Sequence, residues 1–156
     1  FNPAGADKTG LIGDNPSSNY KNLFVVLDDI ALGLKNHIPI FGDDYLTHDG
    51  TCIRDYIHVS DLANGHVSLI DLLNDERTDH IFNLGSGKGF SVYEVISEYE
   101  KVNKVIIKKE IIHKRKGDVP ILRADISKAV KKLGWKNKLT VADMCISSLN
   151  FRKSNK

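Results

Sequence analysis

The sequence is poor in cysteine, in long apolar segments and in net charge, and each shortage excludes a class of protein. The two cysteines, Cys52 and Cys145, lie far apart and have no His or Cys partners at the spacing of a zinc site. No apolar run approaches the roughly 20 residues of a membrane helix, and no secretory leader is visible. We therefore expect a cytoplasmic protein with reduced thiols, no metal site and no membrane partner.

The charge balance argues against a second class of partner. The 156 residues include 22 basic and 20 acidic side chains, which leaves a net charge of +2. This balance gives no support to nucleic-acid binding. Hydrophobic residues make up 41% and charged residues 27% of the chain, which is ordinary for a globular domain with a real core.

The hydrophobic pattern alternates between strand and helix periods. Residues 1–6 are typical of the end of a buried strand that runs into a loop, and turn formers at 10–19 predict a second loop. The predicted helices cover 22–35, 61–73, 92–103, 128–133 and 140–152, and the predicted strands cover 38–41, 80–84 and 105–112. Capping boxes mark two helix starts, Ser91 with Glu94 and Thr140 with Asp143. The alternation predicts an α/β fold.

One glycine-rich segment invites a dinucleotide-binding interpretation. Gly85, Gly87 and Gly89 follow a predicted strand and precede a helix, but the third glycine of G-x-G-x-x-G would fall at Phe90. No acidic residue ends a following strand at the expected distance of about 20 residues. A structural tight turn before a capped helix is therefore favoured over a phosphate site.

Residues 41–66, which read FGDDYLTHDGTCIRDYIHVSDLANGH, carry the strongest signal. Their order and spacing resemble the UDP-glucose 4-epimerase family of the extended short-chain dehydrogenase/reductase superfamily. The resemblance covers essentially the whole chain, including Asn22-Leu23, Asn83-Leu84-Gly85, Arg115-x-Gly117-Asp118 and Leu133-Gly134-Trp135. It implies the C-terminal substrate domain of such an enzyme, with a final strand–helix piece of the Rossmann domain. The Rossmann core itself would be missing, and we expect residues 1–156 to be a fragment.

The resemblance also implies a reaction. UDP-glucose and UDP-galactose interconvert through a 4-keto sugar, while NAD takes and returns the hydride. The superfamily uses a Tyr-x-x-x-Lys pair, but none of the five tyrosines here has lysine four residues on. We therefore expect no catalytic residue in this fragment, which would be inactive alone, and NAD bound mainly by the missing N-terminal domain. A homodimer of the complete enzyme stays open.

The chemistry of a UDP-sugar explains why particular residues are candidates. Arginine suits a diphosphate, carboxylate a ribose diol, an aromatic ring the uracil face, and asparagine the sugar hydroxyls. The resemblance assigns the candidates: Asn2, Asn22 and Leu23 to the sugar and diphosphate, Phe41 to uracil, Arg54 and Arg115 to the diphosphate, Asp118 to the ribose and Leu122 to the hexose.

Plainer interpretations stand beside these assignments. Without the resemblance, Arg54 is more typical of a surface ion pair. Asp55 is typical of a residue that accepts hydrogen bonds from backbone donors in a turn, and His58 of a hydrogen-bonded core histidine. Asp43, Asp44 and Asp49 favour a solvated turn over a metal site. The chain departs from the family at Tyr20-Lys21 and at His113-Lys114, and the latter alters the charge near the diphosphate. Another nucleotide-sugar epimerase or dehydratase, a non-catalytic UDP-sugar-binding module, and a partner-docking domain remain alternatives.

Overall fold

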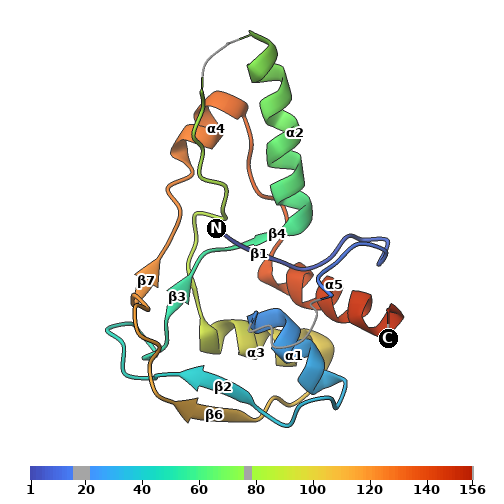
Figure 1. Cartoon of the computed structure of the whole chain (residues 1–156), viewed down its shortest axis with the longest axis vertical. Helices are drawn as coiled ribbons and strands as arrows, with labels where there is room; N and C mark the ends of the chain where they lie inside the picture. The colour runs from blue at the N-terminus through green and yellow to red at the C-terminus, as the bar shows by residue number, and fades with distance from the viewer. Residues whose placement is uncertain (16–21, 76–78, 156) are drawn as a thin grey trace.

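Helices and short strands alternate along the part of the chain that the computed structural model describes, residues 1–15, 22–75 and 79–155 (Figure 1). In chain order the elements are β1 (Asn2–Ala4), α1 (Leu23–Ala31), β2 (Ile38–Phe41), β3 (Ile53–Arg54), β4 (Tyr56–His58), α2 (Val59–Asp75), β5 (Phe90–Ser91), α3 (Val92–Asn103), β6 (Lys109–Ile112), β7 (Ile121–Leu122), α4 (Ser127–Leu133) and α5 (Val141–Ser154). The predicted α/β class is confirmed. Within these ranges, no helix is long and apolar enough to cross a membrane.

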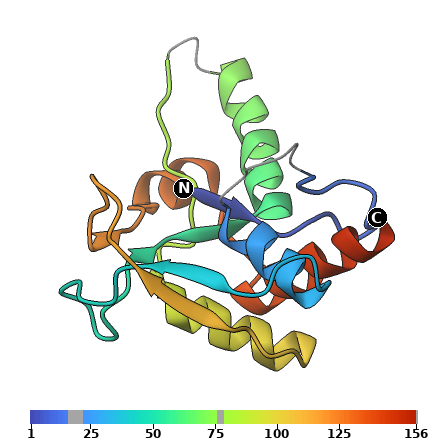
Figure 2. The same ribbon diagram turned by 60° about the horizontal axis from the view of Figure 1, so that its bottom comes forward.

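The strands pair into small sheets that set the directions of the loops. β1 runs parallel to β4, and β2 runs parallel to β6. The short strand β3 has β5 on one side, antiparallel, and β7 on the other, parallel. Figure 2 shows β2 and β6 side by side, with α3 on one side of the pair. Because parallel strands end at the same edge, the loops that follow β2 and β6 start next to each other.

The larger hydrophobic core lies among α1, α3, α5 and the strands beside them. Its buried members include Phe24, Leu27, Ile40, Ile96 and Leu149. A polar group sits inside this core, because Asp28 of α1 is fully buried. The Tyr99 hydroxyl donates a hydrogen bond to Asp28 at 2.7 Å, and the Ser148 hydroxyl donates another. One carboxylate thus links three helices.

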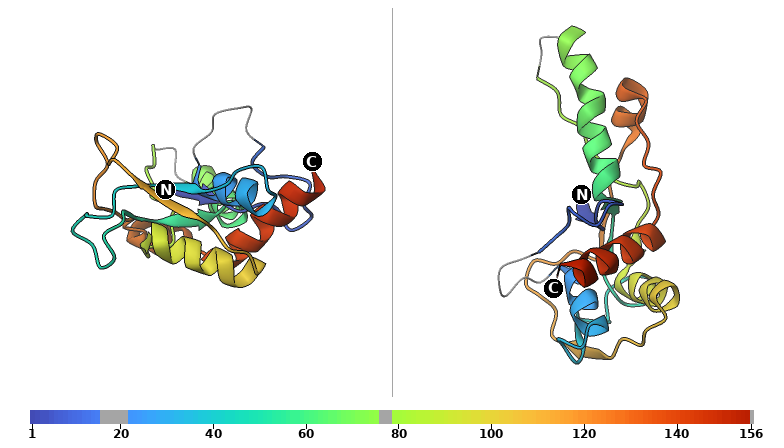
Figure 3. Two further views of the ribbon diagram at one scale, coloured as in Figure 1. Left: turned by 90° about the horizontal axis from the view of Figure 1, so that it is seen from below. Right: turned by 90° about the vertical axis from the view of Figure 1, so that its right-hand side faces the viewer.

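Helix α2 extends away from that core and lies beside α4 (Figures 1 and 3). A second apolar cluster of Ile57, Ala129 and Trp135 fills the space at its base. The Trp135 indole N–H donates to the Asp61 carbonyl oxygen at 3.1 Å, which ties the segment after α4 to the first turn of α2. Farther along α2, Val67, Ile70 and Leu73 are exposed.

The predicted capping boxes are both confirmed. The Glu94 amide donates to the Ser91 hydroxyl at 3.0 Å, and the Ser91 amide donates to the Glu94 carboxylate at 2.7 Å. Thr140 and Asp143 repeat the arrangement at the start of α5. These pairs satisfy amides that have no partner within the helix, which explains why the starts of α3 and α5 could be predicted.

Other predicted helix bounds were wrong. The helix predicted for 22–35 ends at Ala31, because Gly33 adopts a left-handed conformation with φ 73° and reverses the chain. The helix predicted for 61–73 covers Val59–Asp75, so Asp61 lies inside its first turn and not at its start. The Asp61 carboxylate instead accepts from the amides of Lys138 and Leu139, at 2.9 and 2.8 Å.

The strand predicted for 80–84 was wrong, and the one predicted for 105–112 was too long. No strand forms at 80–84, where Ile81 is 82% exposed, because an apolar segment becomes a strand only beside a paired neighbour. Strand β6 is limited to four residues by its partner β2, which offers four. The predicted loop at 10–19 is confirmed for its described part, and residues 16–21 lie outside the described residues.

Candidate functional site

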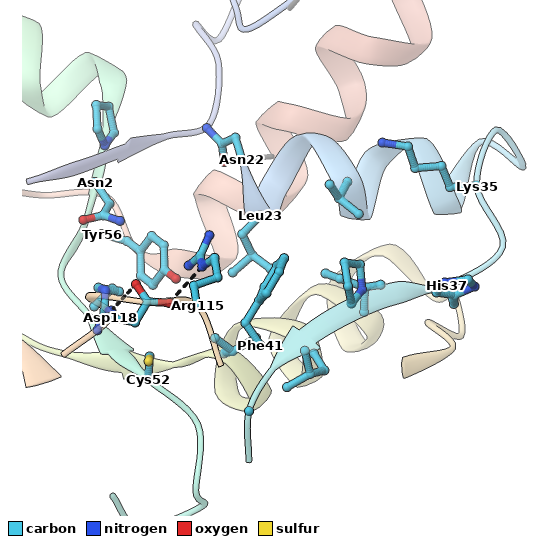
Figure 4. Close-up of a pocket in the computed structure, with 18 of the residues that line it drawn as sticks. Asn2, Asn22, Leu23, Lys35, His37, Phe41, Cys52, Tyr56, Arg115 and Asp118 are labelled. Carbon is cyan, nitrogen blue, oxygen red and sulfur yellow. Dashed lines mark hydrogen bonds and ion pairs between the residues drawn. The ribbon is translucent and has the colours of Figure 1, made fainter. Parts of the chain in front are cut away.

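A cavity of about 780 Å³ opens between α1, β2 and the ends of β3 and β6. Seven of the eight predicted site residues line it although they come from distant parts of the sequence: Asn2, Asn22, Leu23, Phe41, Arg54, Arg115 and Asp118. Figure 4 shows six of them around the same hollow, all except Arg54, which the view does not label. Their roles toward a ligand stay predictions, but the fold gathers them as the resemblance implied.

The N-terminus of α1 forms one wall of the cavity. The Asn22 side-chain oxygen caps the helix by accepting from the Phe24 amide at 3.1 Å, and the first turn contains no acidic residue. The Asn22 side-chain amide reaches Asp14 at 3.4 Å. Because the first amides of a helix carry a partial positive charge, this wall favours an anionic ligand.

Two arginines converge on one carboxylate at another wall. Arg54 Nη2 lies 3.3 Å from Asp118 Oδ1, and Arg115 Nε lies 2.8 Å from Asp118 Oδ2. The Arg54 side chain is only 13% exposed, so its ion pair belongs to the cavity and not to the outer surface. Two guanidinium groups against one carboxylate leave the cluster with a net positive charge.

The backbone fixes Arg54 more firmly than Arg115. Arg54 Nη1 donates to the carbonyl oxygens of Ile53 and Val119, at 2.9 and 2.8 Å. Arg115 is 48% exposed, and its guanidinium lies over the Phe41 ring, 4.4 Å from the centroid (Figure 4). The ring that was predicted to hold uracil therefore has a cation on one face in this structure.

The cavity continues beyond the predicted residues. Lys35 and His37 line its far end, where Lys35 pairs with Asp29 at 3.1 Å and His37 with Glu110 at 2.6 Å. The charge of Lys35 is thus already balanced by a partner on the protein. The apolar stretch between the two ends comes from Val26 and from β2.

Leu122, the eighth predicted residue, does not line the cavity. It is 47% exposed, so it is not a core residue. Leu122 and Arg54 are partners in the β7–β3 ladder, and directly paired residues point to the same face of a sheet. Leu122 therefore lies next to Arg54 at the rim, and its role toward a hexose stays a prediction.

Sequence reasoning missed Tyr56 and Val92, which also line the cavity. Tyr56 is buried against Phe24 in an edge-to-face contact, with 5.6 Å between the centroids, and burial raises its pKa to about 12. Its position two residues after Arg54 could have revealed it, since alternate residues of an extended segment share a face. Nothing local distinguishes Val92, the first residue of α3.

The glycine-rich loop wraps around a carboxylate of the protein itself. Fully buried Asp55 accepts from the amides of Ser86 and Gly87, at 2.6 and 3.0 Å, and from the Ala124 amide at 3.1 Å. A Cβ on Gly85 would lie 2.7 Å from the Cβ of Ala124. The amides of Ser86 and Gly87 thus hold Asp55 in place, which supports the interpretation of this loop as a structural turn.

His58 is a hydrogen-bonded core histidine, as predicted. Its Nδ1 accepts from the Ser60 amide at 3.1 Å, so the proton of the neutral ring must be on Nε2. Nε2 lies 3.1 Å from the Ser147 hydroxyl. Burial lowers the pKa of His58, which keeps the ring neutral. A protonated Nε2 cannot take a proton from Ser147, so this pair is not a nucleophile with its base.

The acidic loop after β2 is structural in part. Asp49 accepts from the Thr51 amide at 2.9 Å and from the Ser91 hydroxyl, so it is tied into the fold and is not solvated as predicted. Asp44 pairs with Lys114. In the described part of the chain, no group of His, Cys, Asp or Glu side chains is arranged to hold a metal ion. Cys52 and Cys145 are buried free thiols.

Comparisons with known proteins agree with this geometry. The family model that matches residues 15–147 is described as GDP-mannose 4,6 dehydratase. The UDP-glucose 4-epimerase of Bifidobacterium longum subsp. longum is 47% identical over 155 residues, which are 99% of this chain and 45% of that protein. The predicted resemblance to UDP-glucose 4-epimerases is therefore confirmed. The chain spans about half the length of the curated relatives it matches.

Solved structures extend the likeness to the fold. The UDP-glucose 4-epimerase of Stenotrophomonas maltophila, with bound NAD and formylated UDP-arabinopyranose, matches with a TM-score of 0.96 and 41% identity over 99% of this chain and 46% of that one. The Bifidobacterium longum enzyme in complex with NAD+ and UDP matches with a TM-score of 0.91 and 46% identity, over 99% and 46% of the two chains.

Proposed function

This chain belongs to the protein family whose model is described as GDP-mannose 4,6 dehydratase, and we propose that it is the UDP-sugar-binding portion of a UDP-glucose 4-epimerase. The whole protein would interconvert UDP-glucose and UDP-galactose. The observation that carries the proposal is the convergence of Arg54, Arg115 and the N-terminus of α1 on one cavity beside Phe41. We prefer an epimerase to a dehydratase because the relatives reported above are named 4-epimerases.

The diphosphate would lie between the two positive walls. Arginine donates charge-assisted, often bidentate bonds to phosphate oxygens, and helix amides add further donors. Arg54 is well suited to this role, because its carbonyl contacts hold the guanidinium in place before a ligand arrives. Asn22, as the cap of α1, keeps the amides of Leu23 and its neighbours directed at the cavity.

The nucleoside would occupy the apolar part of the cavity. Phe41, Leu23 and Val26 offer flat or aliphatic surface for uracil. An ionised carboxylate has about four acceptor positions, so Asp118 can bind a ribose diol while it still holds the arginines. Arg115 would have to share the Phe41 ring with the base or move off it. Asn2 lies at the opposite end from Lys35, in the direction proposed for the hexose.

The residues of this chain do not by themselves fit NAD. The amides of the glycine-rich loop bind Asp55, and the sequence contains neither G-x-G-x-x-G at this loop nor a Tyr-x-x-x-Lys pair. We therefore derive no hydride-transfer step from these residues. The curated relatives are about twice as long as this chain, and the part of them that it does not match is proposed to hold NAD.

Two features support the proposal that a part of the protein outside this chain holds NAD. Parallel sheets are usually large and covered on both faces, yet β1 and β4 pair only with each other within the described residues. Val67, Ile70 and Leu73 are exposed farther along α2, the helix that follows β4. We propose that β1, β4 and α2 are the last strand–helix piece of the NAD-binding domain. We further propose that the complete enzyme is cytoplasmic, where buried Cys52 and Cys145 would stay reduced, and that it can form a homodimer.

Calorimetric titration of the chain with UDP, uridine and inorganic pyrophosphate tests the proposal. UDP should bind more tightly than either part, because it alone fills the charged and the apolar region together. Equal affinity for UDP and pyrophosphate would reduce the site to a general anion site. Failure of UDP to bind at millimolar concentration would overturn the proposal. If UDP binds but the whole protein does not epimerise it, the non-catalytic binding module is favoured.

A further inference from the structure

Two loops leave the carboxyl ends of the parallel strands β2 and β6. We call residues 42–51 the aspartate loop and residues 113–118 the arginine loop, since the latter carries Arg115 and Asp118. The two loops start in contact, because the Gly42 amide donates to the Ile112 carbonyl oxygen at 3.0 Å. Arg115 and Asp118 line the cavity, while the residue before them, Lys114, lines a separate hollow of about 360 Å³ with Gly42, Asp43 and Asp44.

Lys114 holds the aspartate loop through several different contacts. Its Nζ lies 2.8 Å from the Asp44 carboxylate and 3.2 Å from the Asp44 carbonyl oxygen. The same Nζ lies over the Tyr45 ring, 4.5 Å from the centroid. Its aliphatic stem packs on Gly42, where an added Cβ would lie 2.4 Å from Lys114 Cγ. The Lys114 side chain of the arginine loop thus contacts the aspartate loop at Gly42, Asp44 and Tyr45.

The aspartate loop, which Lys114 contacts, is held in shape by its own backbone. The Tyr45 amide donates to the Gly50 carbonyl oxygen at 2.8 Å, which closes the aspartate loop. Gly50 has φ 83°, and a Cβ there would lie 1.8 Å from the Asp43 carbonyl oxygen, so the turn admits only glycine. Tyr45 itself is buried. The arginine loop has no comparable closure of its own: its one internal backbone bond joins the Asp118 amide to the Arg115 carbonyl oxygen at 3.2 Å.

We propose that Lys114 is a positioning residue that latches the arginine loop to the aspartate loop, and that it thereby holds Arg115 and Asp118 in place for a nucleoside diphosphate. Apart from Lys114, the arginine loop is held where Asp118 pairs with Arg54 and where Arg115 lies over the Phe41 ring. The identity of the ligand rests on the proposed function, but the latch itself does not.

The alternative role for Lys114 is simple attraction, since any cation near the site would favour a diphosphate. Asp44→Asn separates the two roles because it keeps the lysine and removes a negative charge. Attraction alone makes UDP bind more tightly to this variant, whereas loss of the latch makes it bind more weakly. Lys116→Met is a matched control: Lys116 is an exposed lysine of the same loop, and within the described residues it makes no ion pair.

The first measurement needs no ligand. Amide hydrogen exchange is followed in the intact chain and in Lys114→Met, Lys114→Arg, Asp44→Asn and Lys116→Met. The latch requires faster exchange at residues 115–118 in Lys114→Met and Asp44→Asn. Lys114→Arg should retain protection, because arginine can make both the ion pair and the ring contact. Unchanged exchange in Lys114→Met refutes the latch, whether or not UDP binds.

The second measurement is the UDP affinity of the same proteins. We expect it to fall by about three- to tenfold in Lys114→Met, the size typical of exposed ion-pair and cation–π contacts, and to fall in Asp44→Asn. In an Arg115→Ala background, Lys114→Met should have less effect, since only Asp118 is then left for Lys114 to position. Fully additive effects, or tighter binding by Asp44→Asn, would overturn the proposal. Absence of UDP binding by the wild type would contradict the proposed function alone.

Discussion

Replacement of Asp28 by asparagine should stabilise this protein above neutral pH. Asp28 is fully buried in the core between α1, α3 and α5, and its hydrogen-bond donors are the hydroxyl groups of Tyr99 and Ser148. Burial disfavours the charged carboxylate and raises the pKa of Asp28 from 3.8 to about 6, although the two hydroxyl bonds act in the opposite direction. At pH 8 the fold therefore contains a buried charge that a neutral isostere would remove.

The magnitude follows from the pKa difference. A pKa that is higher in the folded than in the unfolded state means that the folded state binds the proton more tightly. The contribution of Asp28 to the free energy of unfolding is then highest below about pH 4, falls as the pH rises through about 6, and levels off above that. Each unit of pKa difference is worth about 1.4 kcal/mol, so the upper limit is about 3 kcal/mol. Because the asparagine amide must find an acceptor among two hydroxyl groups, we expect a gain of about 1–3 kcal/mol at pH 8.

Urea unfolding of wild type and Asp28→Asn between pH 4 and pH 8 measures this difference. The advantage of the variant should grow with pH and be absent near pH 4. Asp29→Asn is the matched control, since the neighbouring carboxylate is paired with Arg152 at 2.6 Å and with Lys35 at 3.1 Å. That variant should be less stable than wild type at pH 8. A loss of stability in Asp28→Asn that is equal at both pH values would refute the reasoning.

Three further outcomes are expected. The 156-residue chain mixed with NAD+ and UDP-galactose should form no UDP-glucose, because it has no Tyr-x-x-x-Lys pair, and clear turnover in a coupled assay would refute this. In the complete enzyme, UDP-N-acetylglucosamine should react at a reduced but measurable rate, and Leu122→Tyr should abolish this while it spares UDP-glucose; an unchanged ratio of kcat/KM values would mean that Leu122 does not face the sugar. Gly85→Ala should lower the free energy of unfolding by about 1–3 kcal/mol through its contact with Ala124, and a neutral result in urea would show that the loop can yield.

What could be predicted from the sequence was mostly local. The capping boxes of α3 and α5 involve residues three positions apart, so the sequence contains everything that the interaction needs. The strand predicted for 80–84 failed for the opposite reason, since its apolar residues have the composition of a strand but find no ladder partner among the residues that the structure describes. Strand β6 was predicted too long because its length is set by β2, about 70 residues away in the chain.

In the candidate site, too, some features could be predicted from the sequence and others depend on the fold. Motif resemblance placed Arg54, Arg115 and Asp118 together, but the sequence alone could not show that Asp118 bridges both arginines. The contact of Lys114 with Asp44 joins residues 70 positions apart, and only the pairing of β2 with β6 brings them together. The burial of Asp28 likewise depends on α3 and α5, and nothing near it in the sequence marks it as buried.

The central claim is that Arg54 holds the diphosphate of a UDP-sugar, and titration of UDP into wild type and Arg54→Ala tests it most directly. A lost charge-assisted hydrogen bond is worth about 1.5–3 kcal/mol, so UDP affinity should fall roughly 10- to 150-fold. Arg115→Ala should act in the same direction but less strongly, because half-exposed charges contribute less. Uridine, which has no diphosphate, should bind wild type and Arg54→Ala equally. Unchanged UDP affinity in an Arg54→Ala protein that is folded by circular dichroism would contradict the account.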